Sequence, residues 1–245
     1  MNRLMLCVLT LALTTCATDA PANAADDFPA FRANDVVLFQ GDSITDMNRG
    51  RTLDPNHILG HSYVFIIAAK YGSTYPEKKL TFLNRGISGD TVGGLTRRWD
   101  KDTIALKPTL LSILIGINDL GHGVSSEKYE ESYDKLLADT MKALPDVRLV
   151  LGEPFGLPVG RHKEDWDRYS AELAKRRAVV EKLAAKYHAP VVHYQKAFEE
   201  AAKHAPAEYW IWDAVHPTYS GHQVMADEWV RTVGAFYGKD APPAK

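Results

Sequence analysis

The chain has 245 residues, of which 45% are hydrophobic and 24% are charged, a composition typical of a globular protein with room for one sizeable core. Its formal net charge of -2 leaves no basic excess, which argues against a nucleic-acid partner. Both cysteines, Cys7 and Cys16, lie near the start, so the rest of the chain cannot form a disulfide, a thiol nucleophile or a cysteine-ligated metal site.

Residues 1–24 have the layout of a secretory signal peptide. Arg3 precedes an apolar run, Leu4–Leu13, that is too short to span a membrane, and a cleavage site of small residues ends at Ala24. We therefore expect a secreted or periplasmic protein, cleaved near Ala24 and without stable membrane insertion afterwards. Lipoprotein anchoring at Cys16 is a weaker alternative, because a threonine before the cysteine fits such a site poorly.

Downstream of this segment, short aliphatic runs alternate with longer amphipathic stretches. Five runs are predicted to be strands: Val36–Gln40, Leu80–Asn84, Leu110–Ile115, Val147–Gly152 and Pro190–Tyr194. Five stretches are predicted to be helices: Ser62–Tyr71, Thr91–Leu106, Ser126–Leu144, Glu164–Tyr187 and Thr218–Tyr237. Strands that are apolar at nearly every position are typical of a parallel sheet covered on both faces. The pattern predicts an α/β protein, a three-layer α/β/α sandwich with a five-stranded parallel sheet.

No linker or internal repeat divides the chain after residue 30. We therefore predict one domain over residues 30–238, followed by a flexible tail over residues 239–245.

Polar, glycine-rich segments follow the first three predicted strands. Ser43 comes three residues after the first strand, the segment NRGISGDT (84–91) follows the second, and GINDLGHG (116–123) follows the third. Ligands of open parallel sheets bind at the carboxyl ends of the strands, and glycines there leave backbone N–H groups free to point inward. The same residues are also common in ordinary turns, but three such loops at equivalent places favour one shared site.

A serine hydroxyl needs a base, itself oriented by a third group, before it can act as a nucleophile. Asp213 and His216 lie three residues apart, just ahead of the last predicted helix. One loop can therefore present the carboxylate to one imidazole nitrogen and the other nitrogen to Ser43. The other histidines lack this pattern, and we expect structural roles for most of them.

Four segments in chain order resemble the motifs of the GDSL/SGNH hydrolase family: GDSI (41–44), ISGDT (87–91), GIND (116–119) and DAVH (213–216). The likeness extends over essentially all of the chain after the predicted cleavage site. Ile44 stands where the family name has leucine, a residue of similar bulk. The resemblance implies a flavodoxin-like fold and an esterase or lipase-type acyl transfer without a cofactor.

The mechanism that we expect assigns roles to five residues of these motifs. Ser43 is the nucleophile, His216 is the base and Asp213 holds the imidazole tautomer. The oxyanion hole consists of the backbone N–H groups of Ser43 and Gly89 and the side-chain amide of Asn118.

Two carboxylates close to these residues, Asp42 and Asp119, allow two interpretations. They could bind a cation, but an aspartate near a helix start more commonly accepts backbone N–H groups. Metal sites also gather more ligands than these spacings offer. We therefore expect bracing roles for both residues and no metal.

Two features indicate the substrate: a group of aromatic residues and the amino-acid sequences of the motifs. Tyr209, Trp210 and Trp212 crowd the loop ahead of Asp213, where they can floor a sugar site or close an acyl pocket; they also suit a core or a contact between subunits. We predict that Trp210, Trp212 and Ile117 contact the substrate. The motif strings resemble the acetylxylan-esterase branch of the family, which implies removal of short acyl groups, acetyl above all, from a carbohydrate, as a small-molecule or polysaccharide ester.

Other functions remain open on the sequence alone. A generic short-chain carboxylesterase, a lipase-type acylhydrolase or an acyltransferase would use the same residues. From other classes, a metal-dependent phosphoesterase could use Asp42, Asn118, Asp119 and His216, and a non-catalytic carbohydrate-binding protein could share the fold. The oligomeric state is also undetermined, and a homo-oligomer is compatible with the aromatic surface.

Overall fold

The computed structural model describes residue 28 and residues 30–52 and 54–238. The predicted signal peptide, with Cys16 and the cleavage site at Ala24, and the predicted tail over residues 239–245 lie outside the described residues. Among the helices in the described ranges, none combines the length and the apolar composition needed to cross a bilayer.

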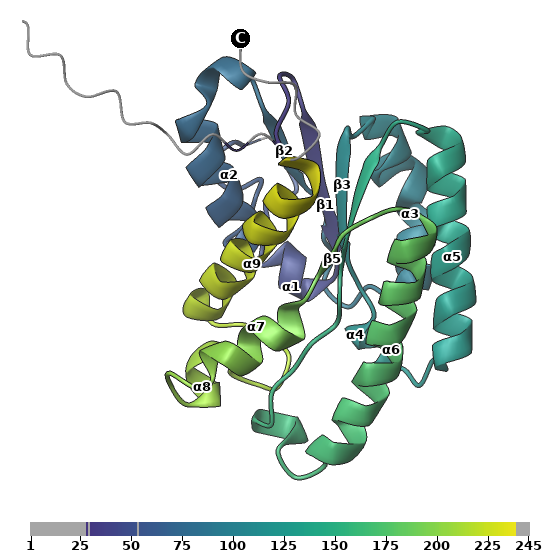
Figure 1. Ribbon diagram of the computed structural model, residues 1–245, viewed down its shortest axis with the longest axis vertical. Helices are drawn as coiled ribbons and strands as arrows, with labels where there is room; N and C mark the ends of the chain where they lie inside the picture. The colour runs from purple at the N-terminus through teal and green to yellow at the C-terminus, as the bar shows by residue number, and fades with distance from the viewer. Residues whose placement is uncertain (1–27, 29, 53, 239–245) are drawn as a thin grey trace, which may run out of the picture.

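The described residues form a central sheet of five parallel strands in the order β2-β1-β3-β4-β5 (Figure 1). Their bounds are β1 Val36–Gly41, β2 Thr81–Asn84, β3 Leu110–Leu114, β4 Arg148–Gly152 and β5 Val191–Val192. This is the doubly wound order of flavodoxin-like folds, in which the chain reverses direction across the sheet after β2. The predicted fold class is therefore confirmed.

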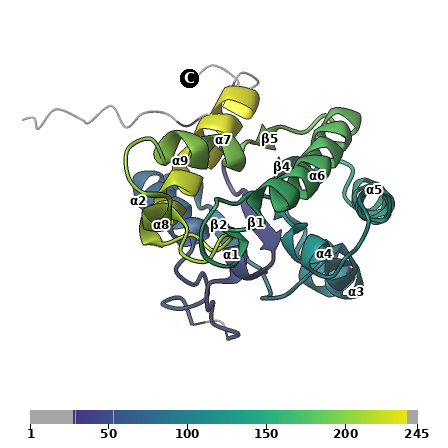
Figure 2. The ribbon, with the colours of Figure 1, turned by 90° about the horizontal axis from the view of Figure 1, so that it is seen from below.

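Helices cover both faces of the sheet (Figures 1 and 2). One layer contains α2 Tyr63–Thr74, α7 Tyr194–Ala201 and α9 Tyr219–Tyr237, and the other contains α3 Val92–Asp102, α5 Ser126–Ala143 and α6 Trp166–Lys186. Short helices lie in the connections: α1 Ser43–Asp46, α4 Ile117–Gly121, α8 Ala207–Trp210 and the 3-10 helices η1 Pro76–Lys78, η2 Ile104–Leu106 and η3 Gly160–His162.

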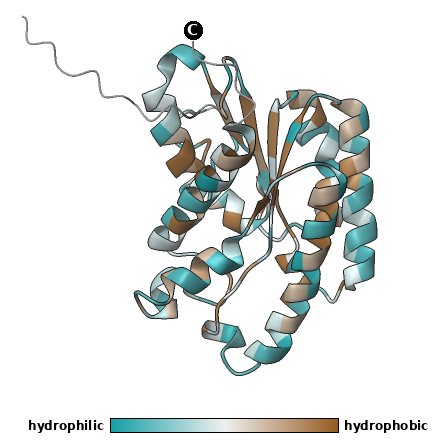
Figure 3. Cartoon of the chain, viewed as in Figure 1, coloured by the Kyte–Doolittle hydropathy of each residue, from teal (hydrophilic) through white to brown (hydrophobic). Residues whose placement is uncertain are grey.

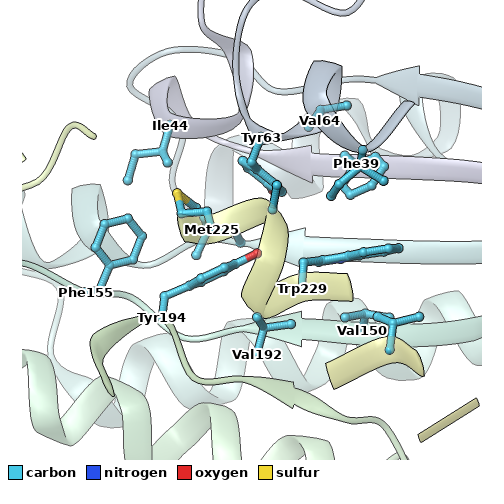
Figure 4. Close-up of a cluster of buried hydrophobic side chains, with 14 of the residues drawn as sticks. Phe39, Ile44, Tyr63, Val64, Val150, Phe155, Val192, Tyr194, Met225 and Trp229 are labelled. Carbon is cyan, nitrogen blue, oxygen red and sulfur yellow. The ribbon is translucent and has the colours of Figure 1, made fainter. Parts of the chain in front are cut away.

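The sheet separates two apolar cores, because successive strand residues point to opposite faces. Phe39 of β1 packs with Trp229 of α9, with ring centroids 5.3 Å apart, whereas its neighbour Leu38 belongs to the core beneath α3 and α5. The Trp229 indole N–H donates to Ser112 Oγ of β3 at 3.0 Å, which satisfies a polar group inside the core. The brown strands of Figure 3 and the side chains of Figure 4 show this apolar interior.

Two predicted elements end earlier than expected. The strand predicted over Pro190–Tyr194 contains only the two residues of β5, because Tyr194 already begins α7 and reaches the core from a helix. The helix predicted over Thr91–Leu106 ends at Asp102. Gln40 donates from its side-chain amide to Asp102 O at 2.9 Å and to Thr103 Oγ1 at 2.7 Å, which satisfies a terminal carbonyl and fixes the break before η2.

His222 connects α9 to the start of α2 from inside the protein. It is 1% exposed, and its Nδ1 accepts the Tyr63 backbone N–H at 3.3 Å. Burial, together with the nearby His61 and His216, lowers the pKa of this imidazole to about 4. The folded protein therefore holds His222 neutral at pH values where the unfolded chain would protonate it.

We expect His222 to make folding weaker in acid. Because its folded pKa lies below its unfolded pKa, its contribution is complete above about pH 6.5 and is lost as the pH falls toward 4. Urea unfolding of the parent and of His222→Asn, which keeps an acceptor near Tyr63, should show the parent losing roughly 2–3 kcal/mol more than the variant between pH 7 and pH 4.5. Equal losses in the two proteins would contradict this assignment, since all other titrating groups are shared.

Candidate active site

The polar loops predicted from the sequence converge at the carboxyl edge of the sheet. Ser43 begins α1 directly after β1, Asn118 lies in α4 after β3, and His216 belongs to the loop before α9. Ser43 and His216 are 173 positions apart in the chain, yet Ser43 Oγ lies 2.8 Å from His216 Nε2. The structure thus brings together an alcohol and an imidazole in the geometry that proton transfer requires.

Ser43 reaches this edge through a tight turn at the end of β1. Gly41 is the last residue of the strand, and a side chain there would collide with Thr45 and come within 2.6 Å of Leu114 O on β3. Asp42 follows as the N-cap of α1, accepting the Ile44 N–H at 3.0 Å. Ser43 therefore occupies the first position of a helix and is partly exposed, while Ile44 behind it is buried in the core.

The bracing roles expected for Asp42 and Asp119 are confirmed. Asp42 caps α1, and both oxygens of Asp119 lie 3.2 Å from the Val92 backbone N–H at the start of α3. Burial raises the pKa of the Asp42 carboxyl to about 7, and the neighbouring Asp119 and Asp90 charges add to the rise while the Ile44 N–H opposes it. Burial likewise raises the pKa of Asp119.

The Asp213–His216 loop is organised around one carboxylate. Asp213 Oδ2 lies 2.7 Å from His216 Nδ1, while Oδ1 accepts the backbone N–H groups of His216 at 2.9 Å and Val215 at 3.2 Å. Burial would raise the pKa of Asp213, but these hydrogen bonds outweigh it and lower the pKa below its usual value. Asp213 is thus ionised at neutral pH, and its contact assigns the Nδ1 proton of His216, leaving Nε2 to face Ser43.

One residue of this loop adopts a strained backbone that the sequence does not signal. Ala214 has φ of 99°, a left-handed conformation that an alanine rarely adopts, and its side chain is fully buried. Its carbonyl accepts the Leu157 N–H at 3.2 Å, which helps to hold it there. Strain of this kind is typical of functional loops, where surrounding contacts maintain a conformation that the residue alone would avoid.

The three groups expected to form an oxyanion hole lie on segments that hydrogen bonds join to one another. Asn118 donates one side-chain N–H to Asp90 O at 2.9 Å, which connects α4 to the loop of Gly89 and leaves the second amide N–H for a ligand. Gly89 is exposed with φ of 84°, and within the described ranges neither its N–H nor that of Ser43 donates to another protein group. An unpaired N–H at each position is what a developing oxyanion needs.

Asp46 anchors the Gly89 loop to α1, a role that sequence reasoning missed. Its buried carboxylate accepts Ser88 N at 3.0 Å and Ser88 Oγ at 3.1 Å, and Arg51 binds both oxygens at 2.6 and 2.9 Å. Burial opposes ionisation, but these donors lower the pKa of Asp46 below its usual value. The sequence carries no signal for this role, because the spacing to Ser88 has meaning only in the fold.

The residues predicted to contact substrate occupy different environments. Trp212 is 63% exposed and stacks beside His216, with ring centroids 6.4 Å apart. Trp210 is only partly buried but packs against the core, and Ile117 lines a pocket of about 490 Å³ together with Asn118. Trp212 is therefore next to His216, Ile117 lies beside Asn118, and Trp210 packs on the core.

A candidate cation site lies apart from the Ser43 motifs. Among the residues that the structure describes, only Glu153, Glu181 and His193 bring three ligand atoms within 4.8 Å of one another. His193 Nδ1 lies 3.4 Å from a carboxylate oxygen of each glutamate, so the three side chains already contact one another directly.

In a comparison with known proteins, residues 39–224 match the model of the GDSL-like Lipase/Acylhydrolase family. An acetylxylan esterase from Geobacillus stearothermophilus is 32% identical over 210 residues, covering 81% of this chain and 93% of that protein. The solved structure of Axe2, an acetylxylan esterase from the same organism, matches with a TM-score of 0.73 at 32% identity, covering 84% of this chain and 96% of that one. LAE5, an alpha/beta hydrolase enzyme from the metagenome of Lake Arreo, matches with a TM-score of 0.74 at 30% identity, covering 84% of this chain and 98% of that one.

Further solved forms of Axe2 describe that protein's activity and its catalytic groups. One variant is named as an acetyl-xylooligosaccharide esterase. Two others are named catalytic mutants, one with a serine and one with a histidine replaced by alanine.

The close approach at Gly41 leads to a stability prediction. Gly41→Ala should lower the free energy of unfolding by at least about 2 kcal/mol, because the added methyl group meets the fixed Leu114 carbonyl and the Thr45 side chain. Chemical denaturation measures the loss. Gly72→Ala is the matched control: a methyl group there meets nothing within 4 Å inside α2, so that variant should be neutral or up to about 1 kcal/mol more stable. A Gly41→Ala protein as stable as the Gly72→Ala protein would show that the turn has room for a side chain.

Proposed function

The chain belongs to the GDSL-like lipase/acylhydrolase family and is a hydrolase of carboxylic esters, and we propose that it is a serine esterase that removes acetyl groups from a carbohydrate. The observation that carries the proposal is the continuous chain of contacts from Asp213 Oδ2 to His216 Nδ1 at 2.7 Å and from His216 Nε2 to Ser43 Oγ at 2.8 Å. Each of these atoms has the hydrogen-bond partner that nucleophilic catalysis by serine requires.

In the first half of the proposed reaction, Ser43 Oγ attacks the acetyl carbonyl while His216 Nε2 takes its proton. The tetrahedral oxyanion is stabilised by the N–H groups of Ser43 and Gly89 and by the free N–H of Asn118. Collapse of this intermediate breaks the bond to the sugar oxygen, and His216 returns the proton to that oxygen. The products are an acetyl-Ser43 enzyme and a sugar with a free hydroxyl group.

In the second half, a water molecule takes the place of the sugar. His216 accepts one of its protons as the water oxygen attacks the acetyl-serine carbonyl, and the same donors stabilise the second oxyanion. Ser43 leaves with the proton from His216, and acetate is released. Asp213 remains ionised throughout and stabilises the imidazolium that forms in each half.

A carbohydrate ester is favoured over other esters by two observations. The relatives whose names specify a substrate act on acetylxylan or acetyl-xylooligosaccharides, and their likeness extends over more than four fifths of this chain. In addition, the exposed indole of Trp212 beside His216 offers a flat apolar face of the kind on which sugar rings stack. Export of the enzyme, indicated by residues 1–24, would place it with polysaccharide outside the cytoplasm.

The proposal is tested by mass spectrometry of the products formed from acetylated xylan and from acetylated xylo-oligosaccharides. The parent enzyme should release acetate and leave oligosaccharides lighter by whole acetyl groups. Ser43→Ala should fold normally and reduce kcat by about 10⁴-fold or more, because no other group can form the acyl-enzyme. Hydrolysis by Ser43→Ala at the parent rate, or a parent that cleaves simple esters but no acetylated saccharide, would refute the corresponding part of the proposal.

Asn118→Ala should lower kcat by about 10²- to 10³-fold with little change in KM, because the amide acts on the oxyanion and not on the bound ester. Steady-state kinetics on p-nitrophenyl acetate separates the two parameters. Asn56→Ala, which removes an exposed amide from the connection between α1 and α2, is the control and should match the parent. If Asn118→Ala raised KM at constant kcat, Asn118 would be a ground-state binding residue and not an oxyanion donor.

A further inference from the structure

A second recognition element lies beside the proposed oxyanion hole. The pocket of about 490 Å³ described above is bounded on one side by α4 and on the other by η3 and the start of α6; it is lined by Ile117, Asn118, Leu120, Gly121, His122, Arg161, His162, Arg168 and Tyr169. Figures 1 and 2 show α4 next to α6 at the carboxyl edge of the sheet. Because Asn118 belongs both to this pocket and to the proposed oxyanion hole, a group bound here is continuous with the ester.

The far wall of the pocket is joined directly to the catalytic loop. Gly160 of η3 has φ of 54°, and a side chain at this position would lie 2.7 Å from Asp213 Cα. The preceding segment donates the Leu157 N–H to Ala214 O at 3.2 Å. The pocket is therefore held at a fixed position between the Asp213 loop and Asn118.

The pocket carries an excess of positive charge, unlike the chain as a whole. Four of the residues that line the pocket are basic, Arg161, Arg168, His122 and His162, and none of the lining residues is acidic. Asp165, beside the pocket, binds Arg168 at 2.5 Å and His162 at 3.0 Å. Asp119 of α4 is buried and its oxygens face Val92. Asp213, on the other side of η3, holds His216. Among the described residues, neither Asp165 nor Asp213 forms an ion pair with Arg161.

Arg161 is the basic residue of this pocket on which the proposal depends. Its side chain is exposed at the pocket, and among the described residues it forms no ion pair. The next residue, His162, stacks its ring on Tyr169 with centroids 3.6 Å apart, and Tyr169 is 8% exposed, so this contact anchors η3 to α6. A guanidinium at the mouth of such a pocket is suited to bind a planar carboxylate through two parallel hydrogen bonds.

We propose that this pocket selects acetylated saccharides that carry a carboxylate, such as a uronic acid on or next to the acetylated sugar, through Arg161. The inference rests on the proposed function, because it names the substrate class of that same site. It makes Arg161 a specificity residue: its guanidinium contacts the sugar carboxylate and takes no part in the transfer of the acyl group.

The test compares kcat/KM for acetylated xylo-oligosaccharides with and without a glucuronic acid substituent, at low and at high salt. The parent should prefer the acidic substrate by about fivefold at low ionic strength, and 0.5 M NaCl should reduce that preference. Arg161→Gln should bring the ratio of the two kcat/KM values close to one. Arg32→Gln, which removes an exposed arginine just before β1 at the opposite edge of the sheet, should retain the parent ratio.

The possible results separate this inference from the proposed function. Deacetylation of the neutral substrate without any preference for the acidic one would overturn the role of the pocket and leave the esterase proposal intact. A preference that survives in Arg161→Gln would overturn the assignment of the residue. Inhibition by glucose 6-phosphate at lower concentrations than by glucuronic acid would also overturn the inference, because the pocket would then be a phosphate site.

Discussion

The site depends on how closely β1 approaches β3 at Gly41. The Gly41 backbone lies against the Leu114 carbonyl and the Thr45 side chain with no space for a methyl group. This contact lets the chain turn at once from a buried strand into α1, so that Ser43 emerges at the sheet edge while Ile44 remains in the core. A longer turn would move the hydroxyl away from His216, which a separate loop holds in place.

Four aspartates then fix the loops around Ser43 by accepting hydrogen bonds from backbone N–H groups. Asp42 caps α1, Asp46 holds Ser88, Asp119 holds the start of α3, and Asp213 closes the loop of His216. Buried carboxylates are costly unless they have such donors, and the donors make each loop rigid in return. The proposed oxyanion donors are therefore oriented before a substrate arrives, which is the condition for electrostatic stabilisation of a transition state.

The spacing of apolar residues predicted the strands and long helices, because a buried face leaves a regular apolar pattern. It failed where an element is too short to show a pattern, or where the same residues suit both a strand and a helix. The Tyr194 ring would be buried whether the residue ended a strand or began a helix, so the sequence does not show the boundary between β5 and α7. The break after Asp102 depends on Gln40, which is remote in sequence. The short helices α4 and α8 contain too few turns to show a period.

The sequence by itself determined the fold class and singled out Ser43, Asp213 and His216 as candidates for one site, because strand–helix alternation and the four motifs are local patterns. Only the tertiary structure decided the 2.8 Å contact between Ser43 and His216, the anchoring of Ser88 by Asp46 and the position of Arg161 in the same pocket as Asn118. These are relations between residues far apart in the chain, set by how helices pack on the sheet. Distance and charge balance are properties of that packing, and no local pattern encodes them.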